Sequence, residues 1–216
     1  MLNLDIIFFD IDGTLVDSRK VIIDAANFTL NSLGLKEKKA DEIISNMKFE
    51  TSYLISKIAD TDDNDLIIKG VKLFRSYWKK NVSRDSRLFS GVREILDYLY
   101  GKKLIITSNG IKDVIEEMLD SFNIRKYFRQ IISGDEVDCI KPTACPINKA
   151  FATLELFSKN NAMIVGDMDV DIRAGKAAGI NTCGVTYGFG KKEDIVKAGP
   201  DYLIDNISEL KNIIKI

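Results

Sequence analysis

Short runs of bulky apolar residues recur along the chain without the alternation of a half-exposed strand. They cover residues 4–9, 103–107, 130–133, 162–166 and 182–186, and a weaker run covers 201–204. Such runs are typical of strands buried on both faces of a parallel sheet. Amphipathic segments of helical length lie near the later runs, at about 91–100, 111–121, 144–157, 170–178 and 191–198. This succession predicts an α/β fold, a doubly wound parallel sheet with a Rossmann-like core.

Residues 17–86 break this succession, because they contain no convincing strand. Four helical stretches are predicted there, near 19–33, 37–47, 50–60 and 63–80. A single crossover helix needs far fewer residues than this segment provides. We therefore expect an α-helical cap domain of residues 17–86, inserted into a catalytic core of residues 1–16 and 87–216. The two connections, near 16–19 and 83–90, are its expected hinges.

Two acidic residues follow the first apolar run, in Asp10-Ile11-Asp12-Gly13-Thr14. Side chains at positions i and i+2 of a strand point to the same side. Ligands of open α/β sheets bind at the carboxyl ends of the strands. The pair could hold a hard cation and divide nucleophilic and acid–base work. Taken alone, the same residues also fit an ordinary Asp-Gly turn.

Two further motifs follow later predicted strands. Thr107-Ser108-Asn109-Gly110 offers a hydroxyl and backbone N–H groups that could cradle a phosphate, although taken alone the motif is better explained as a helix cap. Lys141, which precedes Pro142, could offset the charge of a bound phosphoryl group.

A last motif, Gly166-Asp167-Met168-Asp169-Val170-Asp171, follows the run at 162–166. Asp167 and Asp171 are candidate ligands of the cation that the first motif would also bind. The alternative is that these acids only favour the positive end of a helix.

Composition narrows the possible functions. The net charge is −1, from 31 basic and 32 acidic residues, which gives no reason to expect a nucleic acid or membrane partner. Histidine is absent, so His-dependent nucleophile systems and His-ligated zinc are excluded. The three cysteines show no metal-ligand spacing, and we expect them to be reduced in a cytoplasmic protein, with Cys145 a buried apolar residue. We expect neither a signal peptide nor a membrane span.

The four motifs together resemble those of the haloacid dehalogenase-like hydrolase superfamily. The matching residues are Asp10-x-Asp12-Gly13-Thr14, Thr107, Lys141 and Gly166-Asp167-x-x-x-Asp171. The predicted helical insertion resembles the subgroup with a type 1 cap. The stretches Phe9–Ser18 and Gly175–Ile180 are most similar to phosphoglycolate phosphatases.

The resemblance implies a phosphatase for small phosphorylated metabolites that works through an aspartyl-phosphate. It implies Asp10 as nucleophile and Asp12 as acid–base. Lys141, Thr107 and the amides of Ser108 and Asn109 would bind the phosphoryl group. Mg²⁺ would be held by Asp10, the Asp12 carbonyl and Asp167, with Asp171 in support.

Several questions stay open at this stage. Phosphoglycolate is the first candidate substrate, and a β-phosphoglucomutase-type phosphotransferase, an inorganic pyrophosphatase and a non-enzymatic phospholigand-binding relative are the alternatives. Lys48, in the predicted cap, could contact an acidic leaving group, but a solvated lysine explains it more simply. Oxygen ligands accept both Mg²⁺ and Mn²⁺. The sequence leaves the oligomeric state undetermined.

Overall fold

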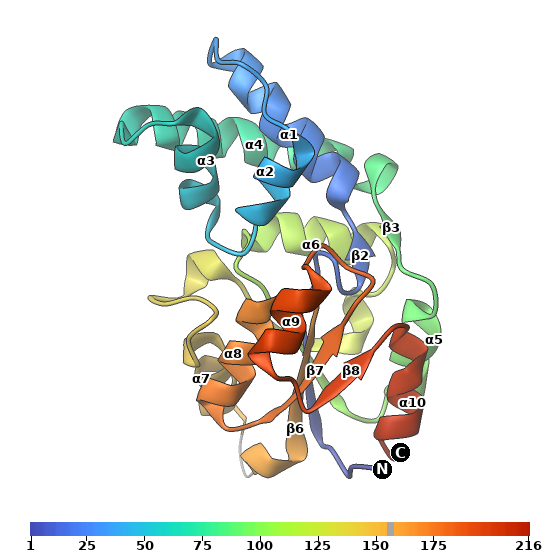
Figure 1. Cartoon of the computed structure of the whole chain (residues 1–216). Coiled ribbons are helices and arrows are strands. Elements are labelled where there is room, and N and C mark those ends of the chain that lie inside the picture. Colours follow the sequence, from blue (N-terminus) through green and yellow to red (C-terminus); the bar gives the residue numbers. More distant parts are fainter. Residues whose placement is uncertain (155–157) are drawn as a thin grey trace.

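The computed structural model describes residues 1–154 and 158–216. Its main sheet has six parallel strands in the order β5-β4-β1-β6-β7-β8 (Figure 1). These are β1 (Ile6–Phe9), β4 (Lys103–Thr107), β5 (Phe128–Ile132), β6 (Ala162–Gly166), β7 (Asn181–Val185) and β8 (Tyr202–Ile204). The predicted doubly wound parallel sheet is confirmed, with small shifts at some strand ends.

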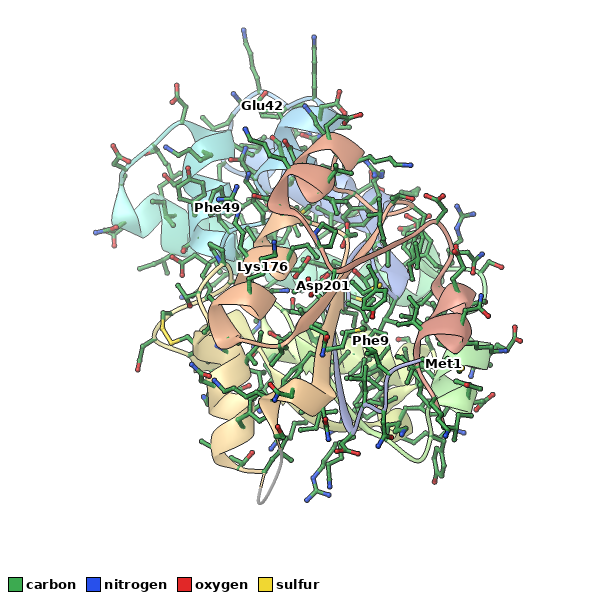
Figure 2. The ribbon with its side chains drawn as sticks, turned by 60° about the horizontal axis from the view of Figure 1, so that its bottom comes forward. Met1, Phe9, Glu42, Phe49, Lys176 and Asp201 are labelled. Atoms are coloured by element: carbon green, nitrogen blue, oxygen red, sulfur yellow. A yellow bond between two sulfur atoms is a disulfide. The ribbon has the colours of Figure 1, made fainter. Side chains whose placement is uncertain are left out.

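The sheet is buried on both faces, as the unbroken apolar runs predict. Along β1, Ile6 and Phe8 belong to one apolar cluster, and Ile7 and Phe9 belong to the other. All four side chains have no exposed surface, and Phe9 lies deep among the strands in Figure 2. Because successive side chains alternate between the faces, one short strand contributes to both halves of the core.

Helices cover these two faces. They are α5 (Val92–Tyr98), α6 (Lys112–Ser121), α7 (Cys145–Ala152), α8 (Asp169–Ala178), α9 (Lys192–Ala198) and α10 (Leu210–Ile213). Apolar residues of α7 and α8 pack against the face of Phe8, and those of α5 and α6 against the face of Phe9. The predicted helix at 144–157 ends earlier, at Ala152, and its last three positions lie outside the described residues. The short α10 had no clear signal in the sequence.

Four helices make up most of the segment of residues 17–86 (the helical segment), as predicted. They are α1 (Arg19–Ser32), α2 (Ala40–Ser45), α3 (Thr51–Ala59) and α4 (Asn64–Asp85), and they lie together above the carboxyl ends of the strands in Figure 1. Buried residues such as Leu54, Phe74 and Trp78 fill the space between them. The division of the chain into a core and a separate cap domain stays a prediction.

A two-stranded antiparallel ribbon that the sequence did not predict joins this segment to the sheet. It pairs β2 (Val16–Asp17) with β3 (Arg87–Leu88). The Arg87 guanidinium donates to the Asp17 carboxylate at 3.0 Å, and the N–H of Phe89 donates to the Leu15 carbonyl at 3.1 Å. Strands of two residues are too short to show periodicity. The ribbon lies where the two hinges were expected.

The expectation of three reduced cysteines is wrong for two of them. Cys139 and Cys145 form a disulfide, drawn as a yellow bond in Figure 2, with their Cα atoms 5.8 Å apart. The interpretation of Cys145 as a buried apolar residue is also wrong. The loop between the two cysteines folds back and brings Cys145 next to Cys139. Cys183 is a free, buried thiol. The predicted cytoplasmic location therefore loses the support that it drew from reduced cysteines.

The described helices include none with both the length and the apolar character that a membrane crossing requires.

The centre of the sheet should dominate the stability of the fold. Replacing Phe8 by Ala should lower the free energy of unfolding by about 3–5 kcal/mol, because a cavity forms between β1 and α7. Urea denaturation measures the loss. Leu203→Ala, on strand β8 at a position 40% exposed, is the matched control and should cost less than about 1 kcal/mol. Equal losses in the two variants would contradict this account.

Candidate active site

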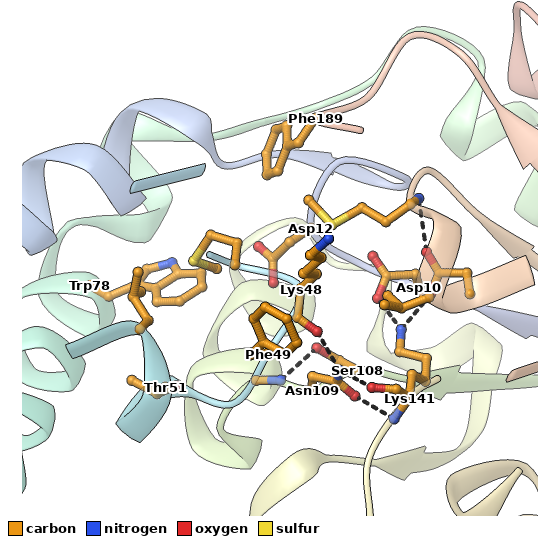
Figure 3. A pocket seen from close by; sticks show the side chains of 16 residues that line it. Asp10, Asp12, Lys48, Phe49, Thr51, Trp78, Ser108, Asn109, Lys141 and Phe189 are labelled. Carbon is orange, nitrogen blue, oxygen red and sulfur yellow. Dashed lines mark hydrogen bonds and ion pairs between the residues drawn. The ribbon is translucent and has the colours of Figure 1, made fainter. Parts of the chain in front are cut away.

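Four neighbouring strands bring the predicted motifs to one edge of the sheet. Asp10 directly follows β1, Thr107 is the last residue of β4, and Asp167 directly follows β6. Lys141 lies in the loop after β5, and Asp171 lies in the first turn of α8. Parallel strands all end on the same side, so residues separated by more than 150 positions, such as Thr14 and Asp167, meet there. Figure 3 shows Asp10 and Lys141 at this place.

The Lys141 ammonium lies at the centre of the site. Its Nζ is 2.6 Å from Asp10 Oδ1, 2.6 Å from Asp171 Oδ1 and 2.9 Å from the Thr107 carbonyl oxygen. The side chain is only 3% exposed, and all three hydrogens of the ammonium have an acceptor. These three hydrogen bonds join Lys141 to the motifs at the ends of β1, β4 and β6.

The Asp167 carboxylate is fully buried and held from two sides. Its Oδ1 accepts a hydrogen bond of 2.9 Å from the Thr14 hydroxyl, and its Oδ2 accepts one of 2.7 Å from the N–H of Phe189. Gly13 has a φ of +89°, and a Cβ there would lie 2.3 Å from Asp167 Oδ2. Glycine is therefore required for the backbone to approach this carboxylate.

Asp171 is positioned by the same kind of close approach. Its Oδ2 accepts a hydrogen bond of 3.0 Å from the N–H of Met168. A Cβ at Gly166 would lie 2.3 Å from the Asp171 Cγ, so the last residue of β6 leaves the room that this carboxylate occupies. Glycine is therefore needed at position 166 to make room for the Asp171 side chain.

Three carboxylates form a candidate metal centre. Asp10, Asp167 and Asp171 each offer an oxygen atom, and these atoms lie within 4.8 Å of one another. All three residues are buried, and hard cations such as Mg²⁺ prefer oxygen ligands. The donor set therefore fits the predicted ion. The Asp12 carboxyl does not belong to this cluster, and its predicted contribution is the backbone carbonyl.

Burial changes the proton affinities of the cluster. Burial raises the pKa of Asp10 to about 8, against the opposing effect of Lys141. Burial and the neighbouring Asp171 raise the pKa of Asp167 to about 7. Burial would lower the pKa of Lys141, but Asp10 and Asp171 outweigh it and raise that pKa above its usual range. Burial therefore favours the protonated forms of the Asp10 and Asp167 carboxyls, whereas its acidic neighbours favour the charged form of Lys141.

The Asp12 carboxyl is only partly buried and lines a pocket in front of Asp10. The Ser18 hydroxyl donates a hydrogen bond to its Oδ1. Burial raises the pKa of Asp12 to about 7, and this hydrogen bond opposes the shift. A carboxyl with a pKa near neutrality can both give and accept a proton at physiological pH.

The predicted phosphate-binding residues take different positions. The Thr107 hydroxyl is buried and has no hydrogen-bond partner among the described residues. The N–H of Ser108 donates to the Ile132 carbonyl at 3.0 Å, so its hydroxyl rather than its amide remains available for donation. The side chain of Asn109 contacts the backbone of Lys141 at both its N–H and its carbonyl.

The pocket in front of Asp10 has an empty volume of about 530 Å³, including part that is open to solvent. Its walls come from the sheet edge and from the helical segment, with Lys48 and Trp78 among the residues of the latter (Figure 3). The Lys48 side chain is 35% exposed, and its Nζ lies 3.9 Å from Asp169 Oδ1. Lys48 therefore lies in the wall of this pocket.

Sequence reasoning missed several residues of the site. Thr14 belongs to the first motif and Ser18 ends the stretch Phe9–Ser18. The acids that they contact were already candidates, so their hydroxyls could have been proposed. The loop after β7 had a weaker signal, the glycines that flank Phe189. The N–H groups of Phe189 and Gly190 donate to Asp167 Oδ2 at 2.7 and 3.3 Å, which only the folded chain reveals.

Comparison with known proteins agrees with this geometry. Residues 7–185 match the family model described as haloacid dehalogenase-like hydrolase. The chain belongs to this family. A phosphoglycolate phosphatase from Aquifex aeolicus (strain VF5) is 32% identical, over 95% of this chain and 94% of the relative. This kinship shows that the chain is a phosphatase, similar to phosphoglycolate phosphatases.

Two further matches cover nearly the whole chain. Pyrophosphatase PpaX from Anoxybacillus flavithermus (strain DSM 21510 / WK1) is 26% identical, over 100% of this chain and 99% of the relative. The crystal structure of a predicted phosphoglycolate phosphatase from Haemophilus somnus 129pt matches with a TM-score of 0.90 and 26% identity, covering 99% of both chains. The helical segment is therefore part of an arrangement that this relative shares.

The raised pKa of Asp10 predicts that the stability of the metal-free protein depends on pH. An unfolded aspartate ionises near 3.8, but folded Asp10 holds its proton up to about pH 8. Between these values the folded state binds more protons, so its stability falls as pH rises. The free energy of unfolding in EDTA should therefore fall, relative to Asp10→Asn, from pH 5 towards about pH 8. Urea denaturation at each pH measures the difference, and a constant difference would contradict this assignment.

Proposed function

We propose that this phosphatase hydrolyses small phosphate monoesters with Mg²⁺, through a phosphorylated Asp10. The observation that carries the proposal is the contact of Lys141 with Asp10, beside Asp167 and Asp171. Phosphoryl transfer depends mainly on positioning and on neutralising the charge of the transferred group. A nucleophilic carboxylate, a buried ammonium and a cation site together meet both requirements.

The residues of the chain divide the chemistry between two steps. In the first step an Asp10 oxygen bonds to phosphorus, the bond to the leaving oxygen breaks, and Asp12 gives that oxygen its proton. In the second step water attacks the phosphorus, Asp12 accepts the water proton, and inorganic phosphate leaves as the Asp10 carboxylate is restored. The pKa of Asp12, raised by burial to about 7, suits both proton transfers.

Mg²⁺, held by Asp10, Asp167 and the Asp12 carbonyl with Asp171 in support, would supply positive charge that favours ionised carboxylates and offsets phosphoryl charge. Lys141, in the loop after β5, supplies a fixed positive charge. The free hydroxyl of Thr107 and the hydroxyl of Ser108 are donors for the phosphoryl oxygens. The amide of Asn109 is the remaining candidate donor of that motif.

The helical segment of residues 17–86 is proposed to act as a cap. It contributes Lys48, Phe49 and Trp78 to the pocket walls, so a substrate would be enclosed between the segment and the sheet. Enclosure excludes bulk water and tests the leaving group. The antiparallel pair of β2 and β3 is the connection about which such a movement would occur.

Phosphoglycolate is the first candidate substrate because relatives with that name match nearly the full chain. Pyrophosphate is the second candidate, favoured by the match to pyrophosphatase PpaX. A panel of phosphoglycolate, pyrophosphate and sugar phosphates with Mg²⁺, read out as free phosphate, tests both. Transfer of phosphate to an added sugar phosphate without release would favour a phosphotransferase instead.

Removing the nucleophile should abolish turnover. Asp10→Asn should lower kcat by at least about 1,000-fold with every substrate, because a neutral amide does not form the phosphoaspartate. Steady-state release of phosphate measures the loss. Asp5→Asn is the matched control, because Asp5 lies at the opposite end of β1, where it accepts a hydrogen bond from Asn161, and its rate should stay within about twofold. Turnover that survives in Asp10→Asn would refute the assignment.

Metal binding should stabilise the fold. Millimolar Mg²⁺ should raise the melting temperature of the wild type above its value in EDTA, because an ion that binds only the folded state stabilises it. Asp167→Asn should remove most of this increase, because it takes away a ligand charge. Thermal unfolding with and without Mg²⁺ measures both. An equal rise in melting temperature in the two proteins would show that the ion binds elsewhere. The same measurement with Mn²⁺ compares the two metals.

A further inference from the structure

One side-chain amide reaches both lysines of the pocket. Asn109 Nδ2 donates to the Lys48 carbonyl oxygen at 2.8 Å and to the Lys141 carbonyl oxygen at 2.9 Å, and Asn109 Oδ1 accepts from the Lys141 N–H at 2.9 Å (Figure 3). Lys141 belongs to the loop after β5, whereas Lys48 belongs to the turn between α2 and α3. Asn109 therefore bridges the core and the helical segment.

The chemistry of the amide matches these contacts. Nδ2 has two hydrogens, and each contacts a different carbonyl. Asn109 is only 7% exposed, so an amide or carbonyl that lost its partner there would stay largely shielded from water. Loss of the Asn109 side chain should therefore displace the backbone groups of Lys48 and Lys141 that it contacts.

These contacts fix the backbones from which both ammonium groups extend into the site. The Lys141 backbone is held at both its N–H and its carbonyl, and its Nζ contacts Asp10. Lys48 is held at its carbonyl, and its side chain lines the same pocket. When the helical segment moves away, the bond to Lys48 must break, so the position of the segment and that of Lys141 are linked through one group.

We propose that Asn109 is a positioning residue that couples the turn at residues 46–50 to Lys141. It aligns both ammonium groups on the substrate only when the helical segment is closed. This role rests on the proposed function and goes beyond binding of phosphate by the backbone amide.

The other side-chain links described between the helical segment and the core do not reach Lys141. Lys48 lies 3.9 Å from Asp169, and Arg19 donates to the Gly188 carbonyl at 3.1 Å. Arg75 and Lys79 of α4 contact Asp113 of α6 at 2.8 and 3.3 Å, and the side chains of both basic residues are nearly half exposed. Exposed pairs of this kind contribute little to stability. Among the contacts described, the bridge through Asn109 is the one that joins the turn at residues 46–50 to the residue that contacts the nucleophile.

Kinetics test the coupling. Asn109→Asp keeps the acceptor for the Lys141 N–H and replaces the two N–H donors by an oxygen, and Asn109→Ala removes all three bonds. Both variants should lower kcat/KM by about 10- to 100-fold, because small displacements of catalytic groups have effects of this size. Asn161→Ala is the matched control, because Asn161 donates to Asp5 at the opposite end of the sheet, and it should stay within about twofold.

Hydrogen exchange separates positioning from a general loss of stability. In the folded Asn109→Ala protein, amides of residues 46–50 and 139–143 should exchange at least about tenfold faster, while those of β1 and β6 stay protected. Asn161→Ala should leave residues 46–50 unchanged. Unchanged exchange in both loops, or a kcat/KM within twofold of the wild type, would overturn the inference. Hydrogen exchange does not require turnover. A wild type without phosphatase activity would therefore refute the proposed function, whereas the exchange data would still test the coupling through Asn109.

Discussion

The site depends on one buried ammonium between buried carboxylates. Lys141 neutralises part of the charge of Asp10 and Asp171. Among the described contacts it is the one basic side chain that forms an ion pair with either acid. Removing one partner of a buried ion pair is costly because the remaining charge keeps its desolvation penalty. The loop after β5 is therefore held in place by its ion pair with the proposed nucleophile, Asp10.

The parallel sheet makes this arrangement possible. Strands β5, β4, β1 and β6 are neighbours and all end on one side, so the residues that follow them converge there. The close approach of Gly13 to Asp167 and of Gly166 to Asp171 then places the carboxylates within reach of a single cation. Buried apolar strands supply rigidity, and the polar groups that they position carry out the chemistry.

The helical segment completes the pocket at the strand ends. Its apolar interior holds four helices together, while its turn at residues 46–50 faces the strand ends and contributes to the pocket. Through Asn109 this turn contacts the backbone of Lys141. If the segment closes over the site as proposed, its position and that of Lys141 are linked through this one side chain.

The sequence by itself determined the order of strands and helices, the helical insertion and the acids at the ends of β1 and β6, because hydrophobic periodicity and local motifs are properties of neighbouring residues. It could not reveal that the loop after β7 holds Asp167, that Ser108 uses its amide within the sheet, or that Cys139 pairs with Cys145. Nor could it predict that Asn109 spans Lys48 and Lys141. These contacts join segments whose proximity arises only when strand ends and loops pack together, so tertiary structure alone decided them.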